Sequence, residues 1–147
     1  MSTAEQREPT AAPSGSCFCG RVRFEASMPS LFCAHCHCTM CRRIHGAGFV
    51  TWFSIPKPQL RITAGESDLV RFQSSDHGTR SFCGSCGSSL FFESTLDPER
   101  IDIPLANMDE PIDREPQLHS YFDCRADWVT VEDSLPRLGG ETGVEPL

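Results

Sequence analysis

Cysteines constrain this chain more than any other feature, because seven of the nine fall into three clusters with the spacing of metal ligands. The first cluster is the C-x-C pair Cys17 and Cys19, followed by Gly20. In an extended segment, residues i and i+2 point to the same face, so this pair can offer two thiolates to one metal. The odd number of cysteines and the tight C-x-C spacing both argue against a disulfide framework. The pattern therefore predicts zinc binding in a compartment where thiols stay reduced.

The second cluster is a C-x-x-C-G knuckle that contains Cys83, Cys86 and Gly87. Its tight turn brings both sulfurs to one point, and Gly87 can take positive φ without steric cost. Together with the first pair, these two thiolates would make a closed four-cysteine zinc site that pins the N-terminal strand to a central hairpin. The alternative interpretation of each pair is two free, buried thiols.

The third cluster, Cys36, Cys38 and Cys41, places three thiols within six residues. Three protein ligands leave a fourth position for water or substrate, which is typical of a catalytic zinc. Cys33 lies just upstream and could complete a set of four, so a second structural zinc is the alternative. His37 sits between two ligands and should point the other way, so we do not expect it to bind the metal.

Two arginines, Arg42 and Arg43, follow the last thiol of this cluster. Cations there stabilise thiolates and can bind a substrate carboxylate through a bidentate fork. The alternative is a solvated basic turn. Of the remaining candidates, we expect the lone Cys124 to be a buried apolar thiol. We expect three histidines to be surface or loop residues: His35, His45 and His77.

Outside the cysteine clusters the sequence consists of short, alternating apolar and polar segments separated by breakers. Strands are predicted at residues 21–25, 49–55, 59–63, 69–73, 79–83, 89–93, 100–105, 119–122 and 128–131. Only residues 39–44 favour a turn of helix. Such a pattern predicts an all-β domain of packed antiparallel sheets with little helix. We expect this domain to span residues 15–135, between a disordered tail at 1–14 and a flexible tail at 136–147.

The formal charge of −7 restricts the partners of the chain. If seven cysteines bind two Zn²⁺ ions as thiolates, the total becomes about −10. A chain this acidic is a poor candidate for binding nucleic acid or an anionic membrane surface. No segment approaches the roughly 18–20 apolar residues of a membrane span, and the N-terminus lacks the apolar core of a secretory signal. These features predict a cytoplasmic protein.

The order of the three cysteine motifs resembles the glutathione-dependent formaldehyde-activating enzyme family. The resemblance rests on residues 15–22 (GSCFCGRV), 36–43 (CHCTMCRR) and 82–87 (FCGSCG), and it extends to His119 and Trp128. It implies a β-tent fold of stacked antiparallel sheets with zinc knuckles. It also implies a structural zinc on Cys17, Cys19, Cys83 and Cys86, and a second zinc on Cys36, Cys38 and Cys41. The glutathione thiol is thought to bind near the second zinc.

The resemblance implies a carbon–sulfur lyase of the S-(hydroxymethyl)glutathione synthase type, which adds glutathione to formaldehyde. Its partners would be a small-molecule thiol and an electrophile. In this hypothesis Arg42 or Arg43 orients a carboxylate and His119 relays a proton, although a satisfied structural role for His119 is an equal alternative. A second hypothesis is a non-catalytic two-zinc scaffold that binds a protein partner. A redox or zinc-buffering thiol protein ranks last.

Overall fold

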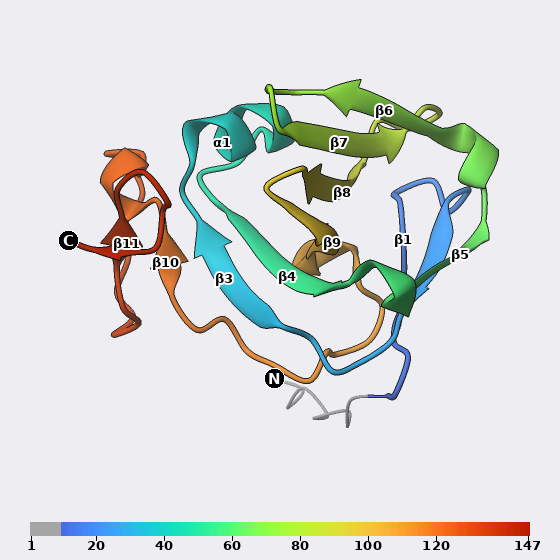
Figure 1. Ribbon diagram of the computed structural model, residues 1–147, viewed down its shortest axis with the longest axis horizontal. Coiled ribbons are helices and arrows are strands. Elements are labelled where there is room, and N and C mark those ends of the chain that lie inside the picture. The colour runs from blue at the N-terminus through green and yellow to red at the C-terminus, as the bar shows by residue number, and fades with distance from the viewer. Residues whose placement is uncertain (1–9) are drawn as a thin grey trace, which may run out of the picture.

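The computed structural model describes residues 10–147, which form mostly β-structure with one short α-helix (Figure 1). The strands are β1 (Ser14–Ser16), β2 (Arg23–Ala26), β3 (Phe32–Cys36), β4 (Val50–Pro56), β5 (Leu60–Ala64), β6 (Leu69–Gln73), β7 (Gly78–Cys83), β8 (Ser89–Ser94), β9 (Asp97–Pro104), β10 (His119–Ser120), β11 (Leu138–Gly139) and β12 (Glu145–Pro146). The helix α1 spans Thr39–His45, and single 3-10 turns span Lys57–Gln59, Glu66–Asp68, Leu105–Asn107 and Phe122–Cys124. The predicted all-β class with stacked sheets is confirmed.

A curved seven-stranded sheet in the order β10-β3-β4-β9-β8-β7-β6 forms most of the fold. A three-stranded sheet in the order β1-β2-β5 lies at its side (Figure 1). Neighbouring strands are antiparallel except β10, which pairs with β3 in parallel. Consecutive strands β6 to β9 pair as a meander, which is the arrangement that short strands separated by frequent turns favour.

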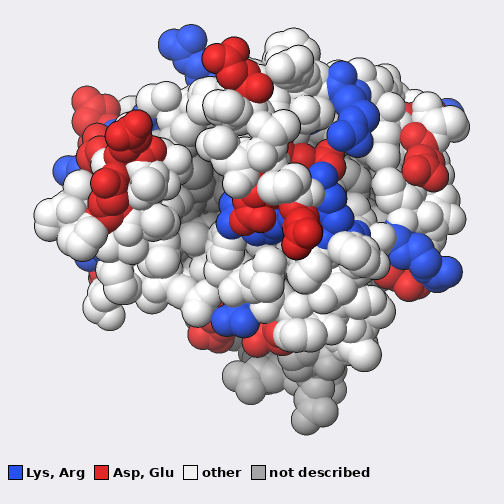
Figure 2. Space-filling view, viewed as in Figure 1, with Lys and Arg blue, Asp and Glu red and all other residues white. Residues whose placement is uncertain are grey.

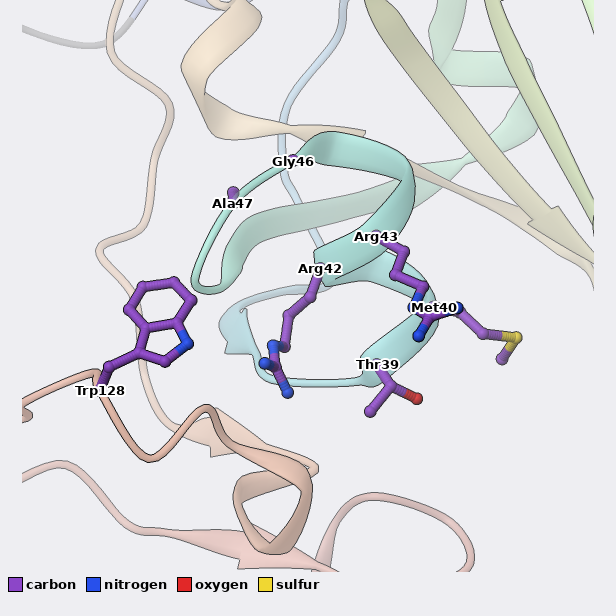
Figure 3. A pocket seen from close by; sticks show the side chains of 7 residues that line it. All are labelled: Thr39, Met40, Arg42, Arg43, Gly46, Ala47 and Trp128. Carbon is purple, nitrogen blue, oxygen red and sulfur yellow. The ribbon is translucent and has the colours of Figure 1, made fainter.

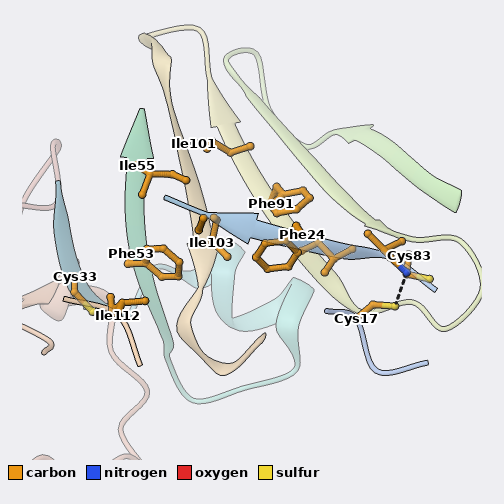
Figure 4. Close-up of a cluster of buried hydrophobic side chains, with 13 residues drawn as sticks. Cys17, Phe24, Cys33, Phe53, Ile55, Cys83, Phe91, Ile101, Ile103 and Ile112 are labelled. Carbon is orange, nitrogen blue, oxygen red and sulfur yellow. Dashed lines mark hydrogen bonds between the residues drawn. The ribbon is translucent and has the colours of Figure 1, made fainter. Parts of the chain in front are cut away.

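The main core fills the space between the two sheets (Figure 4). Phe24 on β2 contacts Phe91 on β8 edge to face, with ring centroids 5.2 Å apart. Phe53, Ile55 and Ile103 extend this cluster and are fully or almost fully buried. The aromatic pair spans both sheets, so it holds the small sheet against the large one.

Strands β3 and β4 present different side chains to their two faces. Cys33 is paired with Phe53 and belongs to the main core, whereas Cys36 is paired with Val50 and belongs to a second cluster near α1. This difference follows from the alternation of side chains along a strand. The large sheet therefore has its main core on one face and a cysteine cluster on the other.

The structure differs from the expected elements at several places. Residues 69–73 form a strand with the predicted limits, and most of the other predicted strands appear with small shifts. Residues 128–131 form no strand, because the segment begins within a turn in which the Val129 amide donates to the Ala126 carbonyl, and Trp128 there is 68% exposed. The sequence interpretation also missed β3, which it treated only as part of a metal motif.

The expected tails also have structure where it is described. Residues 136–147, for which we predicted a flexible tail, contain the antiparallel pair β11 and β12. Residues 11 and 13 accept backbone hydrogen bonds from Met28 and Ala26. Residues 1–9 of the predicted N-terminal tail lie outside the described residues. The domain boundaries at 15 and 135 stay a prediction.

Two observations concern the helices of the structure and the charges on its surface. Within residues 10–147, no helix is long and apolar enough to cross a bilayer. On the face shown in Figure 2, acidic and basic side chains are interspersed.

Substitution of Gly65 tests how closely the end of β5 approaches the loop between β1 and β2. Gly65 has φ +75°, and a Cβ there would overlap the carbonyl oxygen of Arg21, whereas Gly46 has φ +60° and open space around it. We expect Gly65→Ala to lower the free energy of unfolding by about 3 kcal/mol and Gly46→Ala by only about 1 kcal/mol, because only the first adds a clash to the backbone penalty. Chemical denaturation of both variants measures the difference. Equal losses would contradict the close approach at Gly65.

Candidate functional site

The two cysteine pairs predicted to share one zinc come together in the structure. Cys17 and Cys19 lie in the loop between β1 and β2, while Cys83 ends β7 and Cys86 lies in the turn after it. The sulfurs of all four lie within 4.8 Å of one another. The Cys17 and Cys19 sulfurs are 3.5 Å apart, and those of Cys19 and Cys83 are 3.8 Å apart. The fold thus bridges the long sequence gap between the pairs.

This arrangement fits a tetrahedral zinc. Four sulfurs about 2.3 Å from a zinc ion would lie about 3.8 Å from one another, which is close to the observed separations. Both turns have the backbone that such knuckles need: Gly20 and Gly87 take φ of +76° and +80°, and the Gly87 amide donates to the Cys83 carbonyl. Hydrogen bonds from the hydroxyl and amide of Ser88 lower the pKa of Cys86 to about 5, which favours the thiolate that binds a metal.

The second group of cysteines converges where β3 meets α1. The sulfurs of Cys36 and Cys41 are 3.7 Å apart, a separation that also suits two ligands of one zinc. Hydrogen bonds from both of them hold the pKa of Cys38 far below its ordinary value. Cys33 does not join them, since it lies on the opposite face of β3 within the main core. The described residues therefore bring three thiols to this point and place Cys33 in the other cluster.

Two further residues lie near these thiols. Arg80 on β7 is only 6% exposed and directs a nitrogen to the Cys41 sulfur at 3.6 Å, while its guanidinium lies over the ring of Phe92. Tyr121 packs against the same cluster, and burial together with the nearby thiolates raises its pKa. No local pattern in the sequence points to either, because strand pairing alone brings β7 and the segment after β10 to this place.

A groove of about 750 Å³ runs beside the helix α1 (Figure 3). It is lined by Thr39, Met40, Arg42, Arg43, Gly46, Ala47 and Trp128. Arg43 is exposed, whereas Arg42 is half-buried and donates through Nη1 to the Cys124 carbonyl at 2.9 Å. The Nε atom of Arg42 is buried without a partner among the described residues. The groove therefore offers two cations and an indole beside the segment that carries the three cysteines.

The histidines form a network on the other face of β3. His119 pairs in register with His35, and its Nδ1 lies 2.8 Å from Nε2 of His37. The Nε2 atom of His119 lies 2.9 Å from a carboxylate oxygen of Asp133. Burial lowers the pKa of His37 to about 4, so that imidazole is neutral near pH 7. As expected, His37 points away from the thiols that flank it in sequence.

The other candidates lie in varied surroundings. Cys124, which we expected to be a buried apolar thiol, is only half-buried in a 3-10 turn, because its segment covers the surface beside the groove. His77 is exposed in a hairpin loop, as expected. His35 and His45 are less exposed than expected, since both are half-buried, one within β3 and the other at the end of α1. Burial lowers the pKa of His45 to about 4.

Comparison with known proteins gives a consistent set of matches. A family model described as "glutathione-dependent formaldehyde-activating enzyme" matches residues 12–124. A Halomonas elongata protein, provisionally given that same name, is 27% identical over 125 residues, which is 80% of each chain. A Schizosaccharomyces pombe protein described as an uncharacterized lyase is 30% identical over 83 residues, or 55% of this chain and 57% of its own. A crystal structure of a Rhodobacter sphaeroides protein superposes with a TM-score of 0.58 at 24% identity, covering 69% of this chain and 92% of that one, and shows the same fold.

The two cysteine groups should contribute very differently to stability. The contact between Cys19 and Cys83 closes a separation of 64 residues, whereas Cys36 and Cys41 are five apart. Closing the longer loop costs the unfolded chain about 2 kcal/mol more in conformational free energy. The free energy of metal binding at that site therefore contributes directly to folding. We expect Cys83→Ser to abolish cooperative thermal unfolding, while Cys38→Ser and the control Cys124→Ser keep it. Circular dichroism of the purified variants measures this, and equal losses in Cys83→Ser and Cys38→Ser would refute the two roles.

Proposed function

The chain belongs to the glutathione-dependent formaldehyde-activating enzyme family, and from this premise we propose that it adds glutathione or a similar thiol to formaldehyde or a related electrophilic carbon. In this reaction the thiol sulfur forms a bond to the carbonyl carbon while the carbon–oxygen π bond breaks. The thiol proton ends on the oxygen, so the product is a hydroxymethyl thioether and no oxidant or reductant is needed. Such an enzyme is classed as a carbon–sulfur lyase.

The observation that carries this proposal is the convergence of three thiols without a fourth. Cys36 and Cys41 have the sulfur separation of zinc ligands, Cys38 packs against them, and Cys33 faces away. A zinc ion held there would supply an open position that lowers the pKa of a bound thiol, since coordinating thiols are deprotonated. The three cysteines would hold that ion, and Arg80 would place a positive charge beside Cys41.

The groove supports binding of a substrate with carboxylates. Glutathione carries two carboxylates, and an acidic protein would repel them unless local cations were present. Arg42 and Arg43 are such cations, and the lining of the groove starts at Thr39, the residue after Cys38. Because the Nη1 atom of Arg42 is tied to the Cys124 carbonyl, the guanidinium is held in place before substrate binds. We assign to Arg42 and Arg43 the orientation of a substrate carboxylate.

His119 has a less direct part in this proposal. It lies on the face of β3 opposite Cys36 and reaches the three-cysteine segment only through its hydrogen bond to His37. We therefore propose that His119 acts as a positioning residue, which holds the ring of His37 and with it the backbone between Cys36 and Cys38. Tyr121, which packs against the thiol cluster itself, is better placed to exchange a proton with the product oxygen.

The scaffold hypothesis has less support. A closed second zinc site would favour it, since no position would be left for chemistry, and Cys33 is the cysteine that we considered for closing that site. That residue is buried in the main core with Phe53 and Ile112 on the far side of β3. The coarser conclusion, a lyase-family protein with metal-binding cysteine clusters, does not depend on the choice of thiol or electrophile.

Binding of glutathione tests the proposed site. We expect the double variant Arg42→Ala with Arg43→Ala to weaken glutathione binding about ten- to a hundredfold, which corresponds to about 1.5–3 kcal/mol for a lost charge-assisted contact. Cys38→Ser should weaken glutathione binding as well, because the zinc ion would lose one of its ligands and the glutathione thiol would lose the ion that binds it. Isothermal titration calorimetry of the zinc-loaded protein measures both effects. The control is Arg61→Ala, which removes an exposed arginine paired with Glu25 on the small sheet.

A second ligand separates the role of the thiol from that of the carboxylates. S-methylglutathione keeps both carboxylates but cannot supply a thiolate, so the wild type should bind it more weakly than glutathione. The Cys38→Ser variant should bind the two ligands with the same low affinity. Equal affinity of the wild type for both ligands would remove the metal–thiol step from the proposal. A wild type that binds neither ligand would exclude glutathione as the substrate.

A further inference from the structure

A group of potential metal ligands lies outside both cysteine clusters. One ligand atom from each of His35, His119 and Asp133 lies within 4.8 Å of the others. The two histidines are neighbours across the parallel ladder between β3 and β10, with ring centroids 4.9 Å apart. We propose that these three residues form a third metal site, for a divalent transition-metal ion such as Zn²⁺.

The hydrogen bonds of the two histidines have the pattern of metal ligands. A histidine that binds a metal through one ring nitrogen nearly always uses the other in a hydrogen bond that fixes its orientation. His35 Nδ1 lies 2.8 Å from the hydroxyl of Thr51, and His119 Nδ1 lies 2.8 Å from His37 Nε2. Both rings therefore have Nδ1 occupied, which leaves Nε2 of each as the nitrogen available to an ion.

The third ligand is held in place by its own loop. The Leu135 amide donates to a carboxylate oxygen of Asp133 at 3.0 Å, and Arg137 donates to the Asp133 carbonyl at 3.0 Å. The next turn of this loop is fastened to β10, since the His119 amide donates to the Pro136 carbonyl. The carboxylate is thus brought to within 2.9 Å of His119 Nε2 by several independent contacts.

The distances and the charge balance suit an ion. Nitrogen and oxygen ligands about 2.1 Å from a tetrahedral zinc lie about 3.4 Å apart, so small side-chain movements would complete the site. Two neutral imidazoles and one carboxylate leave a net charge of +1 with a divalent ion. The Asp133 side chain is 41% exposed, so solvent can screen that charge and supply the remaining ligand. Two imidazoles with one carboxylate favour zinc, iron or cobalt over magnesium or calcium.

Binding an ion would change the protons of this network in a defined way. With the ion on Nε2, the neutral ring of His119 would carry its single proton on Nδ1 and donate it to Nε2 of His37, so both rings change tautomer and no proton is lost. His37 would then carry its own proton on Nδ1. This state keeps the hydrogen bond by which His119 positions His37, so the third site does not conflict with the function proposed for the thiol centre and does not depend on it.

Cobalt is a suitable probe for this site. Zinc binds more tightly than cobalt to a given set of ligands, so Co²⁺ added to protein already loaded with two equivalents of Zn²⁺ should leave the cysteine sites filled. We expect the wild type to bind one further equivalent, with weak visible absorption and without the intense thiolate-to-cobalt bands that cysteine ligands produce. We expect Asp133→Asn to weaken this binding at least tenfold, because it removes the charged ligand while keeping the shape of the side chain.

The matched control is Glu132→Gln, which neutralises the neighbouring exposed carboxylate and should change the affinity less than twofold. Circular dichroism of Asp133→Asn would show whether the fold is kept, and His119→Gln gives a second variant that removes one nitrogen ligand. The proposal is overturned if the zinc-loaded wild type binds no further cobalt, if Asp133→Asn binds it as well as the wild type, or if thiolate bands show that the cobalt lies on cysteines.

Discussion

The convergence of four thiols from two distant parts of the chain is the constraint on which the rest of the structure depends. Cys17 and Cys19 follow the first strand of the small sheet, while Cys83 and Cys86 follow a strand of the large sheet. Together with the packing of Phe24 on Phe91, this group links the two sheets. A metal held there would act as a cross-link between the sheets, which helps a 147-residue chain because such a chain buries only a moderate share of its surface.

Strand β3 divides the chemistry of the protein between its two faces. Cys36 contributes to the thiol cluster near α1, and the preceding residue, His35, faces the histidine network. Neighbouring residues on one strand would thus serve the two proposed sites of different ligand type, one of sulfur and one of nitrogen and oxygen. Both sites need this strand to stay paired with its neighbours. Its partners β4 and β10 supply that support from either side.

Local signals in the sequence predicted much of the fold and of the thiol sites, and distant pairing accounts for what they did not. The knuckles could be predicted because C-x-C and C-x-x-C-G fix their own geometry within a few residues. Arg80 could not, since it reaches Cys41 only through the meander that places β7 beside that cluster. Strand β3 was not predicted, because its two cysteines and its histidine interrupt the alternation of apolar and polar residues that indicates a strand. The strand expected at residues 128–131 does not form, because no strand among the described residues pairs with this segment. The side chain of Trp128 lines the groove instead.

The groove next to the thiol centre is built almost entirely from one short connection. Six of its seven lining residues come from the segment between β3 and β4, two strands that pair with each other along β3. In evolutionary terms this segment can vary on its own, because substitutions at a few of its groove-lining residues would change which ligand the groove binds without changing the sheet or the knuckles. A change in what this groove binds would therefore need few mutations, within one stretch of about ten residues.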